Sequence, residues 1–228
     1  KNSPEKGNVQ NMGIAMEGLG YNPVVYELLF DMMWGQGVTD LQKWQNQYLL
    51  KRYGSEKIPS VKKAWDILFS SRYTCHESTG MSQLCFQPAL WPNAGTDIQI
   101  VEAWKLMLQD ADKLSQNPSY QFDLANLSRE AMGAFASYYT GKLKKAYENK
   151  NLDHFRISSK KMIEYIRDFD QLMSTSEYFL LGRWIEGFRK WGTTKKQKQL
   201  LEWNAKRQIT DWGGNIGTYA VKEWAGYM

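Results

Sequence analysis

Hydrophobic residues recur every three to four positions along almost the whole chain after residue 22. This spacing puts apolar side chains on one face of a helix and predicts a succession of amphipathic helices that pack by that face. The predicted helices cover residues 24–34, 40–53, 60–69, 98–108, 118–150, 152–173, 178–191, 194–210 and 216–228. The connections between most of them are short, so neighbouring helices are expected to pack against each other.

Local start and stop signals support several of these helices. Asn22 and Asn117 each precede a proline, and an asparagine N-cap followed by proline at the first helical position is a typical helix start. Asp40 is the predicted N-cap of the next helix, and Gly54 is predicted to end it. Ser60 is predicted to cap the helix that follows.

Residues 11–16 are the one segment with the alternation of a β-strand. One face carries Met12, Ile14 and Met16, and the other carries Gly13, Ala15 and, at the strand end, Glu17. Large side chains packing outward and small ones facing inward suit a late strand of a β/α barrel, where catalytic groups sit at the C-terminal strand ends. The alternative is that Glu17 is an ordinary carboxylate in solvent at the end of a strand.

One strand followed by eight or more helices cannot form a barrel by itself. We therefore predict a mainly α chain with two parts: residues 1–38 are the end of a β/α barrel, and residues 39–228 are an all-helical domain, which we expect to be incomplete. No self-similarity at a period of about 30 to 45 residues suggests a helical repeat. Since the chain opens on Lys1, we expect it to be a mature form or a part of something longer.

Composition narrows the function classes. The chain has 228 residues, of which 43% are hydrophobic and 23% charged, as expected for a folded protein. No apolar run is long enough for a membrane span. The net charge of +5 comes from lysines at solvated helix positions, so nucleic acid is not an expected partner.

The sequence offers little for metal or cofactor chemistry. Cys75 and Cys85 lie ten residues apart and would be a loop disulfide in an exported protein or two thiols in a cytosolic one. With His76 they make three possible zinc ligands without a fourth. No glycine-rich phosphate loop or dinucleotide motif occurs, so no metal and no cofactor is expected.

The tryptophans fall into two groups. Trp44, Trp65 and Trp104 lie on the apolar stripes of their predicted helices and are expected in the core. Trp34, Trp91 and Trp212 stand next to glycine or proline at helix ends or in loops. Aromatic rings at such places either stack on sugar rings at a binding site or cap a core.

Several short motifs occur in the order found in one enzyme family. They are Gly13-Ile14-Ala15-Met16-Glu17-Gly18, Asn22, Val24-Val25-Tyr26, Arg52-Tyr53-Gly54, Glu102-Ala103-Trp104, Leu180-Leu181-Gly182, Trp212-Gly213, Tyr219-Ala220 and Ala225-Gly226. By these motifs the chain resembles the alpha-N-acetylglucosaminidase family, glycoside hydrolase family eighty-nine. The resemblance extends over nearly the whole chain, although Met16 stands where the family has proline.

The resemblance implies a retaining exo-glycosidase that removes terminal alpha-linked N-acetylglucosamine from glycans or glycosaminoglycans. The family's nucleophile corresponds to Glu17, and its acid/base glutamate would lie on an N-terminal remainder of the same enzyme. Trp212 and Tyr219 are the expected substrate-binding residues of the pocket wall. The family also implies an exported enzyme, periplasmic, secreted or lysosomal.

Two other functions remain open from the sequence. One is a helical binding or interaction domain without a catalytic role, in which the strand is incidental. The other is a glycosidase of different linkage preference on the same architecture.

Overall fold

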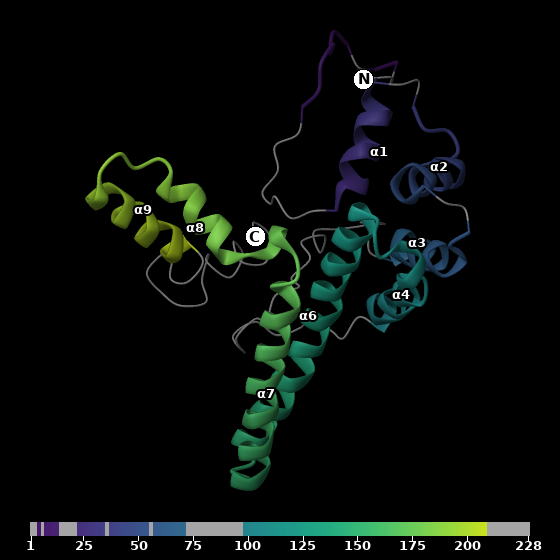
Figure 1. The fold of residues 1–228 in the computed structure, drawn as a ribbon. Coiled ribbons are helices and arrows are strands. Elements are labelled where there is room, and N and C mark those ends of the chain that lie inside the picture. Colours follow the sequence, from purple (N-terminus) through teal and green to yellow (C-terminus); the bar gives the residue numbers. More distant parts are fainter. Residues whose placement is uncertain are drawn as a thin grey trace.

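A computed structural model describes residues 4–5, 7–13, 22–34, 37–54, 57–71 and 98–208 (Figure 1). Helices make up most of this part of the chain. The helices are α1 (Pro23–Trp34), α2 (Leu41–Tyr53), α3 (Pro59–Ser71), α4 (Ile98–Gln109), α5 (Ala111–Leu114), α6 (Pro118–Glu148), α7 (Leu152–Met173), the 3₁₀ turn η2 (Glu177–Phe179), α8 (Leu181–Arg189) and α9 (Lys195–Gln208).

The hydrophobic core lies between α2, α3, α4 and the first half of α6. Trp65 on α3 is its largest fully buried side chain, and Tyr48 on α2 packs edge-on against it with ring centroids 5.6 Å apart. Trp44 stacks on Tyr48 at 5.3 Å. Val24, in the first turn of α1, joins the same core. These contacts confirm the core placement of Trp44 and Trp65, and Trp104 packs against the core partly buried.

The second half of the described chain forms two helical hairpins. The C-terminal half of α6 pairs with α7 in a long hairpin that extends away from the core, and α8 pairs with α9 (Figure 1). The turn between α6 and α7 is tight, with Lys150 at a φ of 51°. Large apolar side chains remain exposed on these hairpins, among them Ile163 on α7 and Trp191 in the turn between α8 and α9.

The predicted helix boundaries are confirmed where the signal is local. Asn22 accepts a bond from the Val24 amide, and Asp40 accepts one from the Lys43 amide. Gly54 ends α2 at a φ of 68°, in the left-handed region. Asn117 caps α6 through the Tyr120 amide.

Two boundary predictions are wrong, and in both cases a distant residue is responsible. Helix α3 begins at Pro59, so Ser60 lies inside its first turn. Its free backbone N–H groups are capped by the Asp110 carboxylate, which accepts from the amides of Ser60 at 3.1 Å and Val61 at 3.2 Å. Hence the cap comes from the residue that follows α4 and has no local sequence signal.

The predicted single helix over 178–191 is interrupted in the structure. Leu180 is extended and separates η2 from α8. The rings of Tyr178 and Phe179 pack on Phe122 of α6, with centroids 5.2 Å and 6.1 Å away. Contact of two aromatic rings with another helix outweighs the weak helical preference of this segment.

The predicted strand over residues 11–16 lies partly outside the described residues. Asn11–Gly13 are described and are not in a strand. A strand needs a neighbouring strand for its backbone hydrogen bonds, and no described residue offers one. Met12 is 49% exposed. The strand and its assignment to a barrel stay predictions.

Candidate functional site

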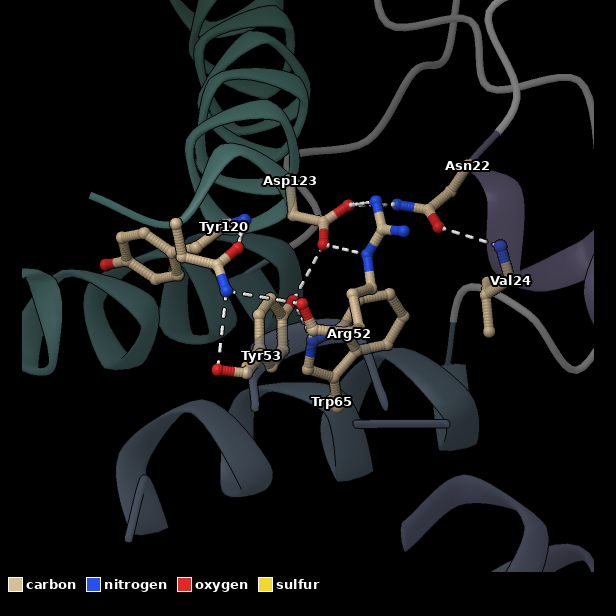
Figure 2. A network of polar contacts seen from close by, with 8 residues as sticks. Asn22, Val24, Arg52, Tyr53, Trp65, Tyr120 and Asp123 are labelled. Carbon is tan, nitrogen blue, oxygen red and sulfur yellow. Dashed lines mark hydrogen bonds and ion pairs between the residues drawn. The ribbon is translucent and has the colours of Figure 1, made fainter. Parts of the chain in front are cut away.

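A buried network of polar side chains adjoins the start of α1, five residues after Glu17 (Figure 2). Asp123 on α6 is its centre and is 2% exposed. Arg52 donates to both of its carboxylate oxygens, through Nη2 to Oδ1 at 2.8 Å and through Nε to Oδ2. The hydroxyl of Tyr53 donates to Oδ2 at 2.8 Å. The end of α2 is thereby bound to the first half of α6.

Asn22 links this network to α1. Its Oδ1 accepts from the Val24 amide at 3.0 Å, which caps the helix. Its Nδ2 donates to Asp123 Oδ1 at 3.2 Å, across 101 positions of sequence. Asn22 is itself buried. One side chain therefore both starts α1 and ties that start to α6.

Further hydrogen bonds hold the network from the other side. The Trp65 indole donates to the Tyr53 hydroxyl at 2.8 Å. Nδ2 of Asn117 reaches the backbone carbonyls of Arg52 and Tyr53, both at 3.3 Å. The Tyr120 hydroxyl donates to the Met107 carbonyl at 2.6 Å. These bonds join α2, α3, α4 and α6 around one buried carboxylate.

The electrostatics keep the donors of the network protonated. Burial alone would lower the pKa of the Arg52 guanidinium, but the hydrogen bonds and negative charge of Asp123 outweigh burial and raise it. Burial raises the pKa of the Tyr53 phenol well above its usual range, and Asp123 adds to the rise. Both side chains remain donors to Asp123 throughout the physiological pH range.

A cavity of about 10 Å³ adjoins the network, lined by Asn22 and Asp123 and, further along α6, by Asn126 and Glu130. A volume of this size holds about one water molecule and is far too small for a sugar ring. The network is therefore a structural anchor and not a sugar-binding pocket.

The residues predicted to carry chemistry lie outside the described part of the chain. They are Glu17, Trp212 and Tyr219, together with Trp91, Cys75 and Cys85. Trp34 is described and lies at the end of α1 with 70% of its surface exposed. The structure therefore describes the segment that follows Glu17 from Asn22 onward, and the pocket residues stay predictions.

The described residues include neither a metal-binding group nor a membrane-spanning helix. No three of their histidine, cysteine, aspartate and glutamate side chains are grouped closely enough to hold a metal ion. None of the helices in this part has the length and apolar content needed to cross a bilayer.

Sequence reasoning did not identify Asp123 or the role of Arg52. A signal for Asp123 exists: it lies three residues after Tyr120 and four before Leu127, on the apolar stripe of α6. A carboxylate on a buried helix face requires a cationic or hydrogen-bonding partner. The sequence does not say which of its many cations is that partner, because Arg52 lies 71 positions away.

The sequence of this chain matches those of known proteins. The model of the alpha-N-acetylglucosaminidase C-terminal domain matches residues 44–228. The chain is 32% identical to human alpha-N-acetylglucosaminidase, an alignment that covers 95% of the chain and 30% of the human protein. The chain thus spans about a third or less of that relative.

Solved structures agree with this match. The fold resembles a family 89 glycoside hydrolase from Clostridium perfringens in complex with 2-acetamido-1,2-dideoxynojirmycin, with a TM-score of 0.73 and 26% identity over 87% of this chain and 25% of that one. It also resembles the Clostridium perfringens enzyme with two glutamates replaced by glutamine, bound to its substrate GlcNAc-alpha-1,4-galactose, at a TM-score of 0.74 and 25% identity. The helices described above, the sequence match over residues 44–228 and these structural likenesses together show that the chain belongs to the alpha-N-acetylglucosaminidase family of glycoside hydrolases and carries that family's C-terminal domain.

Proposed function

We propose that the chain is the C-terminal portion of a retaining exo-glycosidase that hydrolyses terminal alpha-linked N-acetylglucosamine. The observation that supports this most directly is the 32% identity to human alpha-N-acetylglucosaminidase over 95% of the chain. With 95% of the chain aligned, at most about a dozen residues fall outside the alignment, so it extends to Glu17. The substrate class is supported by the GlcNAc-alpha-1,4-galactose complex of a structural relative.

In the proposed reaction Glu17 is the nucleophile. Retaining hydrolysis uses two carboxyl groups about 5 Å apart, of which one attacks the anomeric carbon and the other protonates the leaving oxygen. The covalent glycosyl-enzyme ester is then cleaved by water, which the second group activates as a base. We assign that second group to an N-terminal remainder of the enzyme. A structural relative was solved bound to its substrate with two of its glutamates replaced by glutamine. This pair of replacements fits a reaction that uses two carboxyl groups.

Trp212 and Tyr219 are the proposed wall of the sugar pocket. Trp212 precedes Gly213 and Gly214, which allow a sharp backbone turn, and Tyr219 follows seven residues later. Aromatic rings at these positions would stack on the apolar face of a sugar. The proposed function also implies an exported enzyme acting on glycans or glycosaminoglycans outside the cytosol.

Replacing the nucleophile tests the proposal. In the full-length enzyme, Glu17→Gln should remove turnover of an aryl alpha-N-acetylglucosaminide while the fold is kept, because an amide cannot form the glycosyl-enzyme ester. The matched control is Glu27→Gln, an equal change on an exposed position of α1, which should leave activity unchanged. Glu17→Gln activity within about tenfold of wild type would show that the nucleophile assignment is wrong.

A further inference from the structure

We propose that Asn22 and Asp123 are positioning residues of the enzyme: they anchor the end of the segment that carries Glu17 to the helical domain. The inference rests on the proposed function, in which Glu17 is the nucleophile. It adds a role for the helical domain, namely to hold the catalytic segment in place from outside the barrel.

The covalent distance between nucleophile and anchor is short. Glu17 precedes Asn22 by five residues, and a fully extended chain of that length spans at most about 18 Å. Gly18, Leu19 and Gly20 lie between Glu17 and Asn22 in the sequence, and glycine allows more backbone conformations than other residues. A fixed end point at Asn22 therefore removes much of the freedom that this segment would otherwise have.

The end point is held firmly. Asn22 and Asp123 are 7% and 2% exposed, so bulk water has little access to their hydrogen bond. Asp123 is oriented independently of Asn22 by the guanidinium of Arg52 and the hydroxyl of Tyr53. Charge-assisted, two-point contacts of this kind fix direction as well as distance. The position of the Asn22 amide is thus set by α2 and α6 together (Figure 2).

Apart from the Asn22–Asp123 bond, few buried contacts hold α1 to the rest of the fold. Val24 and Met33 are its buried residues, and half of its residues are exposed. At the other end, Asp31 accepts a bond from the Trp44 indole at 2.7 Å. Loss of the Asn22–Asp123 bond would leave Val24 as the main buried contact at the N-terminal end of α1, next to the catalytic segment.

The catalytic consequence follows from the sensitivity of covalent catalysis to geometry. A displacement of about 1 Å of a reacting group can cost on the order of a hundredfold in rate. Loosening the anchor should lower kcat and leave substrate binding nearly unchanged, since Asn22 does not have to touch the substrate to act.

The test is Asn22→Ser in the full-length enzyme. Serine keeps the N-cap of α1 but lacks the Nδ2 donor to Asp123, and Asp123 keeps Arg52 and Tyr53 as partners, so the variant should fold. We expect kcat to fall about tenfold with KM within about twofold, and the amide hydrogens of residues 14–21 to exchange faster with deuterium.

Asn151→Ser is the matched control. It makes the same substitution at another asparagine N-cap, where Asn151 Oδ1 accepts from the His154 amide at the start of α7, outside the network around Asp123. It should leave kcat, KM and the exchange at 14–21 unchanged. An unchanged kcat in Asn22→Ser, or an equal fall in both variants, overturns the proposal. If Glu17→Gln kept its turnover, the proposed function would fail, whereas the exchange measurement would still report on the anchor.

Discussion

At the scale of single residues, Asp123 shows how a buried charge is tolerated. Its carboxylate receives four hydrogen bonds, from Asn22, from Tyr53 and two from Arg52. Each carboxylate oxygen therefore has two donors, and the positive charge of Arg52 lies in direct contact. Desolvation of such a pair is costly, but removal of one partner costs more because the other is left charged and buried.

We therefore expect Asp123→Asn to destabilise the chain strongly. The free energy of unfolding should fall by ~3–5 kcal/mol, the typical effect of breaking a buried ion pair. Urea unfolding followed by circular dichroism measures it. Asp66→Asn, the same change at an exposed position of α3, should stay within about 0.5 kcal/mol of wild type. Equal effects at the two positions would contradict a central role for Asp123.

At the scale of elements, α3 depends on a cap from another part of the chain. Asp110 is buried and lies at the N-terminus of α3, where the helix dipole favours a negative charge. Burial alone would raise the pKa of its carboxyl, but the hydrogen bonds from Lys113 and from the Val61 and Ser60 amides outweigh burial and lower the pKa.

This lowered pKa predicts how stability changes with pH. The ionised carboxylate stabilises the fold above the unfolded pKa of about 3.9, and this contribution is lost as pH falls through the lower folded value. Asp110→Asn should cost about 1–2 kcal/mol of unfolding free energy at neutral pH, and the difference from wild type should shrink below about pH 4.

Unfolding curves of both proteins at several pH values give this comparison. Asp112→Asn, an exposed neighbour of Asp110, is the control and should change little at any pH. A difference between wild type and Asp110→Asn that stays constant down to about pH 3 would mean that the carboxylate charge does not stabilise α3.

At the scale of the whole molecule, the chain corresponds to 30% of the human relative and 25% of the bacterial ones. In the described part, α7, α8 and α9 bury few side chains and expose several large apolar ones, including Ile157 and Trp203. Apolar surface of this kind is typical of a face that packs against further protein.

We expect the 228-residue chain by itself to lack glycosidase activity, because retaining hydrolysis needs a second carboxyl group that we assign to the N-terminal remainder. The measurement is release of the aryl group from an aryl alpha-N-acetylglucosaminide, with the full-length enzyme as the positive control. Turnover by the isolated chain that disappears in Glu17→Gln would refute this division of the catalytic groups.

Much of the secondary structure could be predicted because its determinants are local. The caps at Asn22, Asp40 and Asn117 and the stop at Gly54 act within four residues, and the helical spacing of apolar residues identifies each buried face. The same spacing placed Trp44 and Trp65 in the core. The sequence motifs also identified the family, which the comparisons confirm.

Tertiary structure decided what depends on residues far apart in the chain. The pairing of Asn22 and Arg52 with Asp123, the cap that Asp110 supplies to α3, and the break at Leu180 caused by packing on Phe122 join positions about 50 to 100 residues apart. Local sequence carries no signal for such partners, because any cation or aromatic ring of suitable chemistry would serve. The packing of α2, α3 and α6 around one core selects which of them meet.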